Sequence, residues 1–193
     1  QQAGEPVAGS TDPLTAGNGS LMRLAPIVLF YFPDNRQIQA FAADSSRTTH
    51  AAPEAIECCQ LLADMIARAL EGADKTQLRQ SLLAEYSQPK VVAIARGEYL
   101  GKKENEIKGS GYSVQSLEAA LWCFHHTQTY ADAILKAANL GDDADTTAAI
   151  VGQLAGTYYG ARAIPEHWLE QLHDGEEITA TADRLLEASR LGT

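Results

Sequence analysis

The sequence contains few cysteines and few basic residues. Only 3 of its 193 residues are Cys, and two of them, Cys58 and Cys59, are neighbours. This pattern excludes a disulfide framework and indicates a reducing, cytoplasmic setting. Lys and Arg number 15 against 25 Asp and Glu, which gives a formal charge of −10. Because phosphate backbones are bound by basic side chains, this balance argues against a nucleic-acid partner. A small anionic ligand would need backbone N–H groups or a bound cation.

Long apolar runs and targeting signals are also lacking. Residues 148–160 carry no charge, but they fall well short of the ~18 apolar residues that a membrane span needs. We therefore expect a buried helix here and no membrane partner. Residues 1–9 have neither the basic region nor the apolar core of a signal peptide. They also lack an initiator Met, so we expect that a preceding part of the chain was removed.

Several common catalytic motifs are missing. There is no Walker loop, no Rossmann fingerprint, no Gly-x-Ser-x-Gly elbow and no His-x-x-x-His pair. The adjacent His125 and His126 would diverge on a helix and could not hold one metal ion together.

Helical periodicity dominates the chain, and the fold class it predicts is all-α. Helices are expected at residues 19–32, 35–43, 53–71, 74–86, 113–126, 130–139, 148–160, 165–172 and 176–191. Residues 44–50 are predicted to form a polar loop. Residues 87–111 are predicted to be irregular, with a brief strand at 91–94. At this length we expect a single domain over residues 1–193.

The most informative stretch is an acidic turn at residues 142–147, with the sequence Asp-Asp-Ala-Asp-Thr-Thr. Three carboxylates in four positions repel one another unless a cation or a helix N-terminus stabilises them. Carboxylate and hydroxyl oxygens favour Mg²⁺, Ca²⁺ or Mn²⁺ over zinc. The alternative is that Asp143 or Asp145 only caps the following helix.

Three further segments carry candidate binding residues. The turn Gly17-Asn18-Gly19 would leave backbone N–H groups free just before a helix, as anion sites do. His50 follows a run of hydroxyl residues, which indicates either ligand binding or local capping. Tyr112, beside Ser110 and Gly111, is the aromatic residue best placed to stack on a base.

Four blocks in order resemble the ADP-ribosylglycohydrolase family, which includes dinitrogenase reductase-activating glycohydrolase. They are residues 16–26, 45–50, 109–122 and 138–160. The resemblance implies a compact orthogonal helical bundle with two Mg²⁺ ions, or Mn²⁺ in their place. It also implies hydrolysis of the N-glycosidic bond between ADP-ribose and a modified side chain, commonly arginine, with an ADP-ribosylated protein as partner.

The resemblance also assigns residues to the site. Metal ligands are Asp143, Asp145 and Thr146, and substrate-binding residues are Asn18, Gly19, Ser20, His50, Ser110, Gly111 and Tyr112. Asp142 stands where the motif commonly has Gly, so no ligand role is expected for it.

One departure from the family bears on activity. The family's Gly-Asp-rich opening motif and its Thr-Asp-Asp motif are absent from these residues. In the family these motifs supply the remaining metal ligands and an acidic residue important in catalysis. We therefore expect that this chain is the C-terminal portion of a larger domain and that an N-terminal fragment of the same enzyme is its partner. The sequence does not identify the catalytic residue. The alternative is a non-catalytic module that binds ADP-ribose or blocks an ADP-ribosyltransferase.

Overall fold

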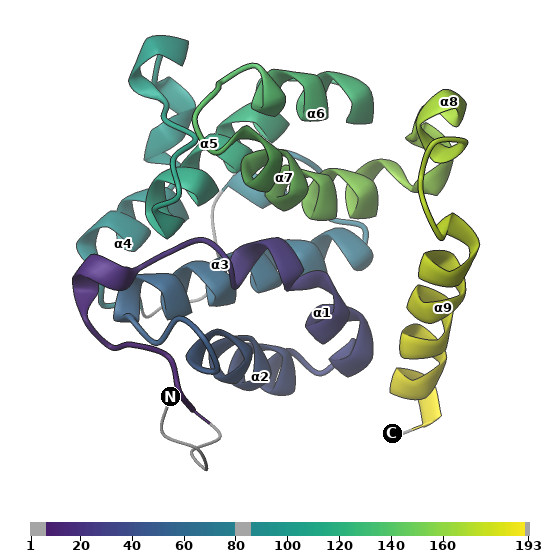
Figure 1. Ribbon diagram of the computed structural model, residues 1–193, viewed down its shortest axis with the longest axis horizontal. Helices are drawn as coiled ribbons and strands as arrows, with labels where there is room; N and C mark the ends of the chain where they lie inside the picture. The colour runs from purple at the N-terminus through teal and green to yellow at the C-terminus, as the bar shows by residue number, and fades with distance from the viewer. Residues whose placement is uncertain (1–6, 80–85, 192–193) are drawn as a thin grey trace.

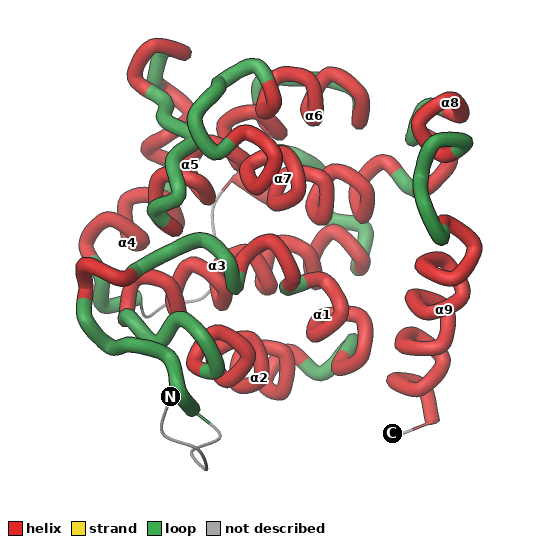
Figure 2. The backbone as a smooth tube through the Cα atoms, viewed as in Figure 1, coloured by secondary structure: helices red, strands yellow, loops and turns green. Residues whose placement is uncertain are grey.

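The computed structural model describes residues 7–79 and 86–191, and this part of the chain forms helices joined by short turns (Figure 1). The helices are α1 (Ala25–Tyr31), α2 (Asn35–Arg47), α3 (Pro53–Leu70), α4 (Pro89–Ala95), α5 (Ser113–His125), α6 (Tyr130–Ala138), α7 (Ala144–Tyr159), α8 (Glu166–Leu169) and α9 (Gly175–Leu191). Figure 2 shows no strand in the described residues; two isolated bridges join Ser10 to His50 and Gly17 to Tyr112. The all-α prediction is confirmed.

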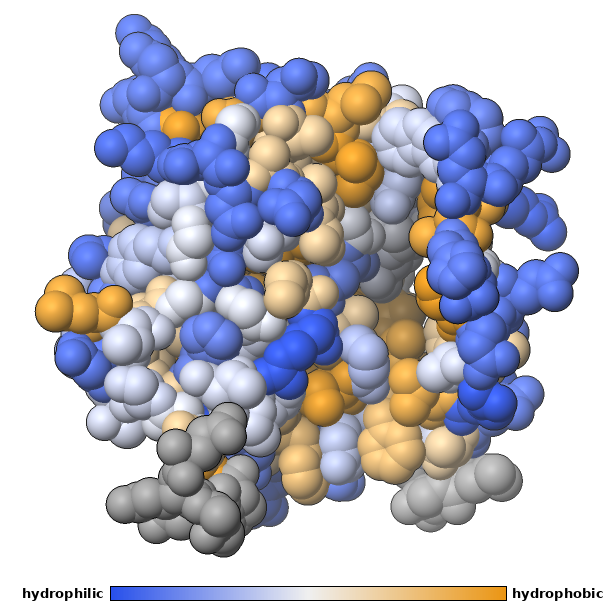
Figure 3. Space-filling model, viewed as in Figure 1, coloured by the Kyte–Doolittle hydropathy of each residue, from blue (hydrophilic) through white to orange (hydrophobic). Residues whose placement is uncertain are grey.

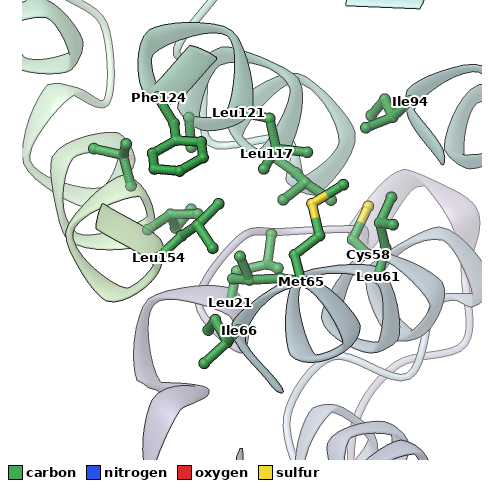
Figure 4. Close-up of a cluster of buried hydrophobic side chains, with 14 of the residues drawn as sticks. Leu21, Cys58, Leu61, Met65, Ile66, Ile94, Leu117, Leu121, Phe124 and Leu154 are labelled. Carbon is green, nitrogen blue, oxygen red and sulfur yellow. The ribbon is translucent and has the colours of Figure 1, made fainter. Parts of the chain in front are cut away.

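The core forms where α3, α5 and α7 meet. Figure 4 shows Met65 of α3, Leu117 and Phe124 of α5, and Leu154 of α7 turned toward one another, all almost fully buried. Pro53 starts α3, where its missing N–H costs no helical hydrogen bond. α2 packs against α3 and α6 packs against α7. The predicted helix at 53–71 is therefore correct, and it lies at the centre of the molecule.

Two local predictions were wrong. α2 does not end at residue 43 but continues to Arg47, so Ser45 and Ser46 are helical rather than part of a loop. Residues 91–94 form part of α4 rather than a strand. Val91 and Ile94 are three positions apart and both buried, so on a helix they share the face that meets the core.

Other boundaries shifted. The predicted helix at 19–32 divides into a 3₁₀ turn, Leu21–Arg23, and α1, with Pro26 in the first turn of α1. Within the segment predicted at 74–86 the structure has a 3₁₀ turn, Gln77–Arg79, and residues 80–85 lie outside the described residues. The helix predicted at 165–172 is reduced to α8.

α9 stands beside the bundle and packs on α1 (Figure 1). Apolar side chains of the two helices, including Leu29, Ile178 and Leu185, line a groove between them, and Figure 3 shows apolar surface in this region. Among the described helices, none has the length and apolarity needed to cross a membrane.

Candidate functional site

Backbone hydrogen bonds join three of the four sequence blocks. The N–H of Asn18 donates to the Gly111 carbonyl at 3.0 Å, and the N–H of Ser113 donates to the Ala16 carbonyl at 2.9 Å. The N–H of Asp143 donates to the Gly109 carbonyl at 2.8 Å. Segments more than 90 positions apart in the chain therefore meet at one place.

The Asn18 side chain links these segments a second time. Its Nδ2 donates to Asp143 Oδ2 at 2.6 Å and to Ser116 Oγ at 3.0 Å, and its residue is only 7% exposed. This hydrogen bond is the main reason why the pKa of Asp143 lies below its ordinary value, with the Thr146 hydroxyl adding to the effect. Asp143 is therefore a carboxylate at neutral pH.

The acidic turn has an unusual backbone that explains its sequence. Gly141 has φ +75° and Asp142 has φ +60°, so the chain crosses the left-handed region twice before α7. Glycine adopts that region freely, and Asp tolerates it better than most residues. This accounts for Asp142 at a position where the family motif commonly has Gly. Asp142 is exposed and shapes the turn.

Asp143 occupies the N-cap position of α7, but its side chain makes no capping hydrogen bond. Its carboxylate instead accepts from Asn18, far away in the sequence. Simple helix capping by Asp143, the alternative considered from the sequence, is therefore not what the structure shows. Asp145 is exposed and Thr146 is half-buried on the first turn of α7.

Two carboxylates and one hydroxyl give an all-oxygen donor set that fits Mg²⁺ or Mn²⁺. Within residues 7–79 and 86–191, no group of three or more His, Cys, Asp or Glu side chains is arranged to hold a metal ion. Asp143, Asp145 and Thr146 therefore remain predicted ligands.

His50 lies against the turn formed by residues 17–19. A Cβ atom added to Gly19 would stand 2.8 Å from His50 Cε1, and one added to Gly17 would stand 3.1 Å from Nε2. Only glycine lets the ring come this close. Burial and the nearby Arg23 guanidinium lower the pKa of His50, so the imidazole is neutral at pH 7.

A hydrogen-bond chain orients that ring. Arg23 Nη2 donates to Thr49 Oγ1 at 2.8 Å, and Thr49 Oγ1 lies 2.8 Å from His50 Nδ1. Arg23 is thus a cation linked to His50 through the Thr49 hydroxyl.

The predicted residues Gly19 and Ser20 contribute to the site in different ways. The Ser20 hydroxyl is fully buried and receives hydrogen bonds from Ser46 Oγ at 2.9 Å and Cys59 Sγ at 3.3 Å, so it faces the interior. The backbone N–H groups of Gly19 and Ser20, however, donate to no group in the described part of the chain. Gly19 is partly exposed, so its N–H is open to an anionic ligand, whereas Ser20 is fully buried and its N–H is not.

The segment from Ser110 to Tyr112 forms the other side of the site. Ser110 Oγ donates to Gln115 Oε1 at 2.6 Å, and Gly111 is exposed beside Asp143. The Tyr112 hydroxyl donates to the Glu54 carboxylate and accepts a hydrogen bond from Lys90 Nζ at 2.8 Å. All ten predicted residues therefore belong to one connected region, although the Ser20 hydroxyl faces away from it.

Sequence reasoning missed several residues that support this region: Ser116, Glu54 and Lys90. Ser116 is buried on α5 among residues that are mostly apolar, and that mismatch was the only signal available. Glu54 looks like an ordinary acid in a first helical turn, so no signal identified it.

The fold agrees with comparisons to known proteins. The sequence model of the family described as ADP-ribosylglycohydrolase matches residues 1–192, and the chain belongs to that family. The chain is 42% identical over 179 residues to an ADP-ribosylarginine hydrolase Tri1 of Pseudomonas putida (strain GB-1), covering 93% of this chain and 48% of that protein. It is 29% identical over 178 residues to an ADP-ribosyl-(dinitrogen reductase) glycohydrolase of Rhodospirillum rubrum, covering 91% and 58%.

A solved structure described as an ADP-ribosylglycohydrolase-related protein complex superposes with a TM-score of 0.86 at 40% identity. The match covers 97% of this chain and 65% of that one. The chain spans about half the length of the curated relatives it matches.

Proposed function

We propose that this chain provides the ADP-ribose-binding side and part of the metal site of an enzyme that hydrolyses the N-glycosidic bond between ADP-ribose and a modified arginine. The observation that carries the proposal is the bond from Asn18 to Asp143. It joins the turn that carries the free Gly19 N–H to a carboxylate held in its ionised form. Relatives named ADP-ribosylarginine hydrolase support arginine as the modified residue.

Each group has a chemical task in this proposal. The N–H group of Gly19 would bind a diphosphate oxygen, with the Arg23 guanidinium nearby. The neutral His50 would contact the ribose. Tyr112 would stack on the adenine. Asp143, Asp145 and Thr146 would hold Mg²⁺, or Mn²⁺ in its place, and a bound Mg²⁺ would supply a Lewis acid beside the ribose.

The proposed metal site needs more ligands than Asp143, Asp145 and Thr146 supply. An octahedral Mg²⁺ ion takes six oxygens, and three side chains fill only part of two such shells. We propose that further carboxylates, and the acidic residue that assists cleavage, come from a segment outside these 193 residues. Cys58, Cys59 and Cys123 are free thiols, which supports a reducing, cytoplasmic setting.

Calorimetric titration of the chain with ADP-ribose, with and without Mg²⁺, tests the proposal. We expect Mg²⁺ to tighten binding, and Asp143→Ala or Asp145→Ala to abolish this gain. Asp142→Asn is the matched control, since it removes a carboxylate from the same turn and Asn also tolerates positive φ. In a complete enzyme that carries this chain, the same two alanine variants should stop the release of ADP-ribose from ADP-ribosylarginine. Metal-independent binding without turnover would instead favour the non-catalytic module.

A further inference from the structure

The hydroxyl of Tyr112 lies between two charged side chains. It donates to Glu54 Oε2, while Lys90 Nζ donates to the phenol oxygen at 2.8 Å and lies 3.5 Å from Glu54 Oε1. The three residues come from different elements. Glu54 is in the first turn of α3, Lys90 is in α4, and Tyr112 directly precedes α5.

The ring of Tyr112 is also held by apolar contact. It packs against a small cluster of Ala16, Ala52 and Ala55 and remains half-buried. Lys90 Nζ is 4.9 Å from the ring centre but only 2.8 Å from the hydroxyl, so the ammonium lies at the hydroxyl end of the ring. The cation therefore fixes the hydroxyl more than it covers the face of the ring.

We propose that Glu54 and Lys90 are positioning residues for the adenine end of the ligand. They fix Tyr112 by its hydroxyl, so that the ring meets the base in one orientation. This inference rests on the proposed function. Charge-assisted hydrogen bonds are the stronger kind, and a side chain ordered before binding loses less conformational entropy when the ligand arrives.

The two charged residues do not contribute equally. The side chain of Glu54 is 16% exposed, whereas that of Lys90 is 63% exposed. An exposed ion pair contributes little because water and salt screen it. Most of the positioning therefore comes from Glu54, and Glu54→Gln, which keeps the shape of the side chain, is the informative variant.

A double-mutant cycle tests the inference. The full chain is titrated with ADP-ribose in four forms: wild type, Glu54→Gln, Tyr112→Phe and the double variant. Tyr112→Phe keeps the ring but removes the hydroxyl. We expect each single change to weaken ADP-ribose binding by about fivefold to tenfold, with the double variant no weaker than either, since both changes break one interaction.

Two controls separate positioning from general support of the fold. Glu57→Gln removes a carboxylate one turn further along α3 that accepts from Ser87 and Gln88, and it should leave binding unchanged. Ribose 5-phosphate lacks the base, so its affinity should not change in Glu54→Gln.

Three results would overturn the inference while leaving the proposed function intact. The first is an ADP-ribose affinity that Glu54→Gln does not change, and the second is a Glu54→Gln effect that is as large in the Tyr112→Phe background as in the wild type. The third is a Glu54→Gln variant that binds ADP-ribose and ribose 5-phosphate more weakly by the same factor. A wild-type chain that fails to bind ADP-ribose at all overturns the proposed function and this inference together.

Discussion

At the scale of single residues, the site depends on Asn18 more than on any acid that attracted attention in the sequence. Its amide is buried and joins its own turn to two other segments, through Ser110 and Ser116 in one and Asp143 in the other. An amide can do this because it donates two hydrogen bonds and carries no charge of its own to desolvate.

We expect Asn18→Ala to lower the free energy of unfolding by about 1–3 kcal/mol, because it leaves buried polar partners without a donor. The pKa of Asp143 should rise toward its ordinary value, since the hydrogen bond from Asn18 is the largest cause of its lowering. Urea denaturation and the NMR titration of the Asp143 carboxyl carbon measure these two effects. Gln115→Ala, which also removes an amide from this region, should leave the pKa of Asp143 unchanged. An unchanged pKa in Asn18→Ala would contradict the assignment.

Residue roles were only partly predictable from the sequence. The acidic turn could be recognised because three carboxylates in four positions need a physical explanation. Nothing in the pattern, however, indicates that the Ser20 hydroxyl faces Ser46 and Cys59 rather than a ligand. Side-chain direction at a turn depends on how distant helices pack, and that information is not local.

At the scale of elements, the C-terminal end of α5 shows two opposing electrostatic effects. Lys75 Nζ donates to the carbonyls of Phe124 and Thr127 at 2.5 Å each, which satisfies the helix end with a cation. His125, the last residue of α5, would also be favoured as a cation at this helix end. Burial opposes this more strongly, with the positive charge of Lys75 adding to it, and together they lower the pKa of His125 to about 4.

This pKa predicts sensitivity to acid. The folded state keeps His125 neutral, while the unfolded chain protonates it near pH 6.5. The stability that comes from a neutral His125 is therefore fully present above pH 6.5. As the pH falls toward about 4, the free energy of unfolding declines by an amount on the order of 2–3 kcal/mol. His125→Leu should remove this part of the decline in thermal melts between pH 7 and 4. His173→Gln, at a side chain that is 95% exposed, is the control and should follow the wild type. Parallel curves for His125→Leu and wild type would contradict the prediction.

Element types were predictable where periodicity was long, and least so where it was short. α3 extends over 18 residues, and its apolar face determined the prediction. Residues 91–94 contain β-branched side chains in a run too short to distinguish a strand from a helix. Packing of Val91 and Ile94 on the core decided in favour of α4.

At the scale of the whole molecule, the site is a product of long-range packing. The segment that leads into α5, residues 109–113, lies against residues 16–18. The acidic turn at the start of α7 lies beside the same segment. No periodicity predicts such a meeting. The order of the four sequence blocks predicted it through resemblance to a family whose fold is known.

The same packing should make the three thiols report on global unfolding. Cys58 and Cys59 of α3 and Cys123 of α5 are fully buried in one core. Burial raises the pKa of each thiol, to about 12 for Cys123, so little reactive thiolate exists in the folded state. We therefore expect all three to react with a thiol reagent at one slow rate set by opening of the core. Gln128→Cys, at an exposed position, should add one thiol that reacts at the rate of a free cysteine. If Cys123 reacted well ahead of Cys58 and Cys59, α5 would open without α3, and the core would not be a single cooperative unit.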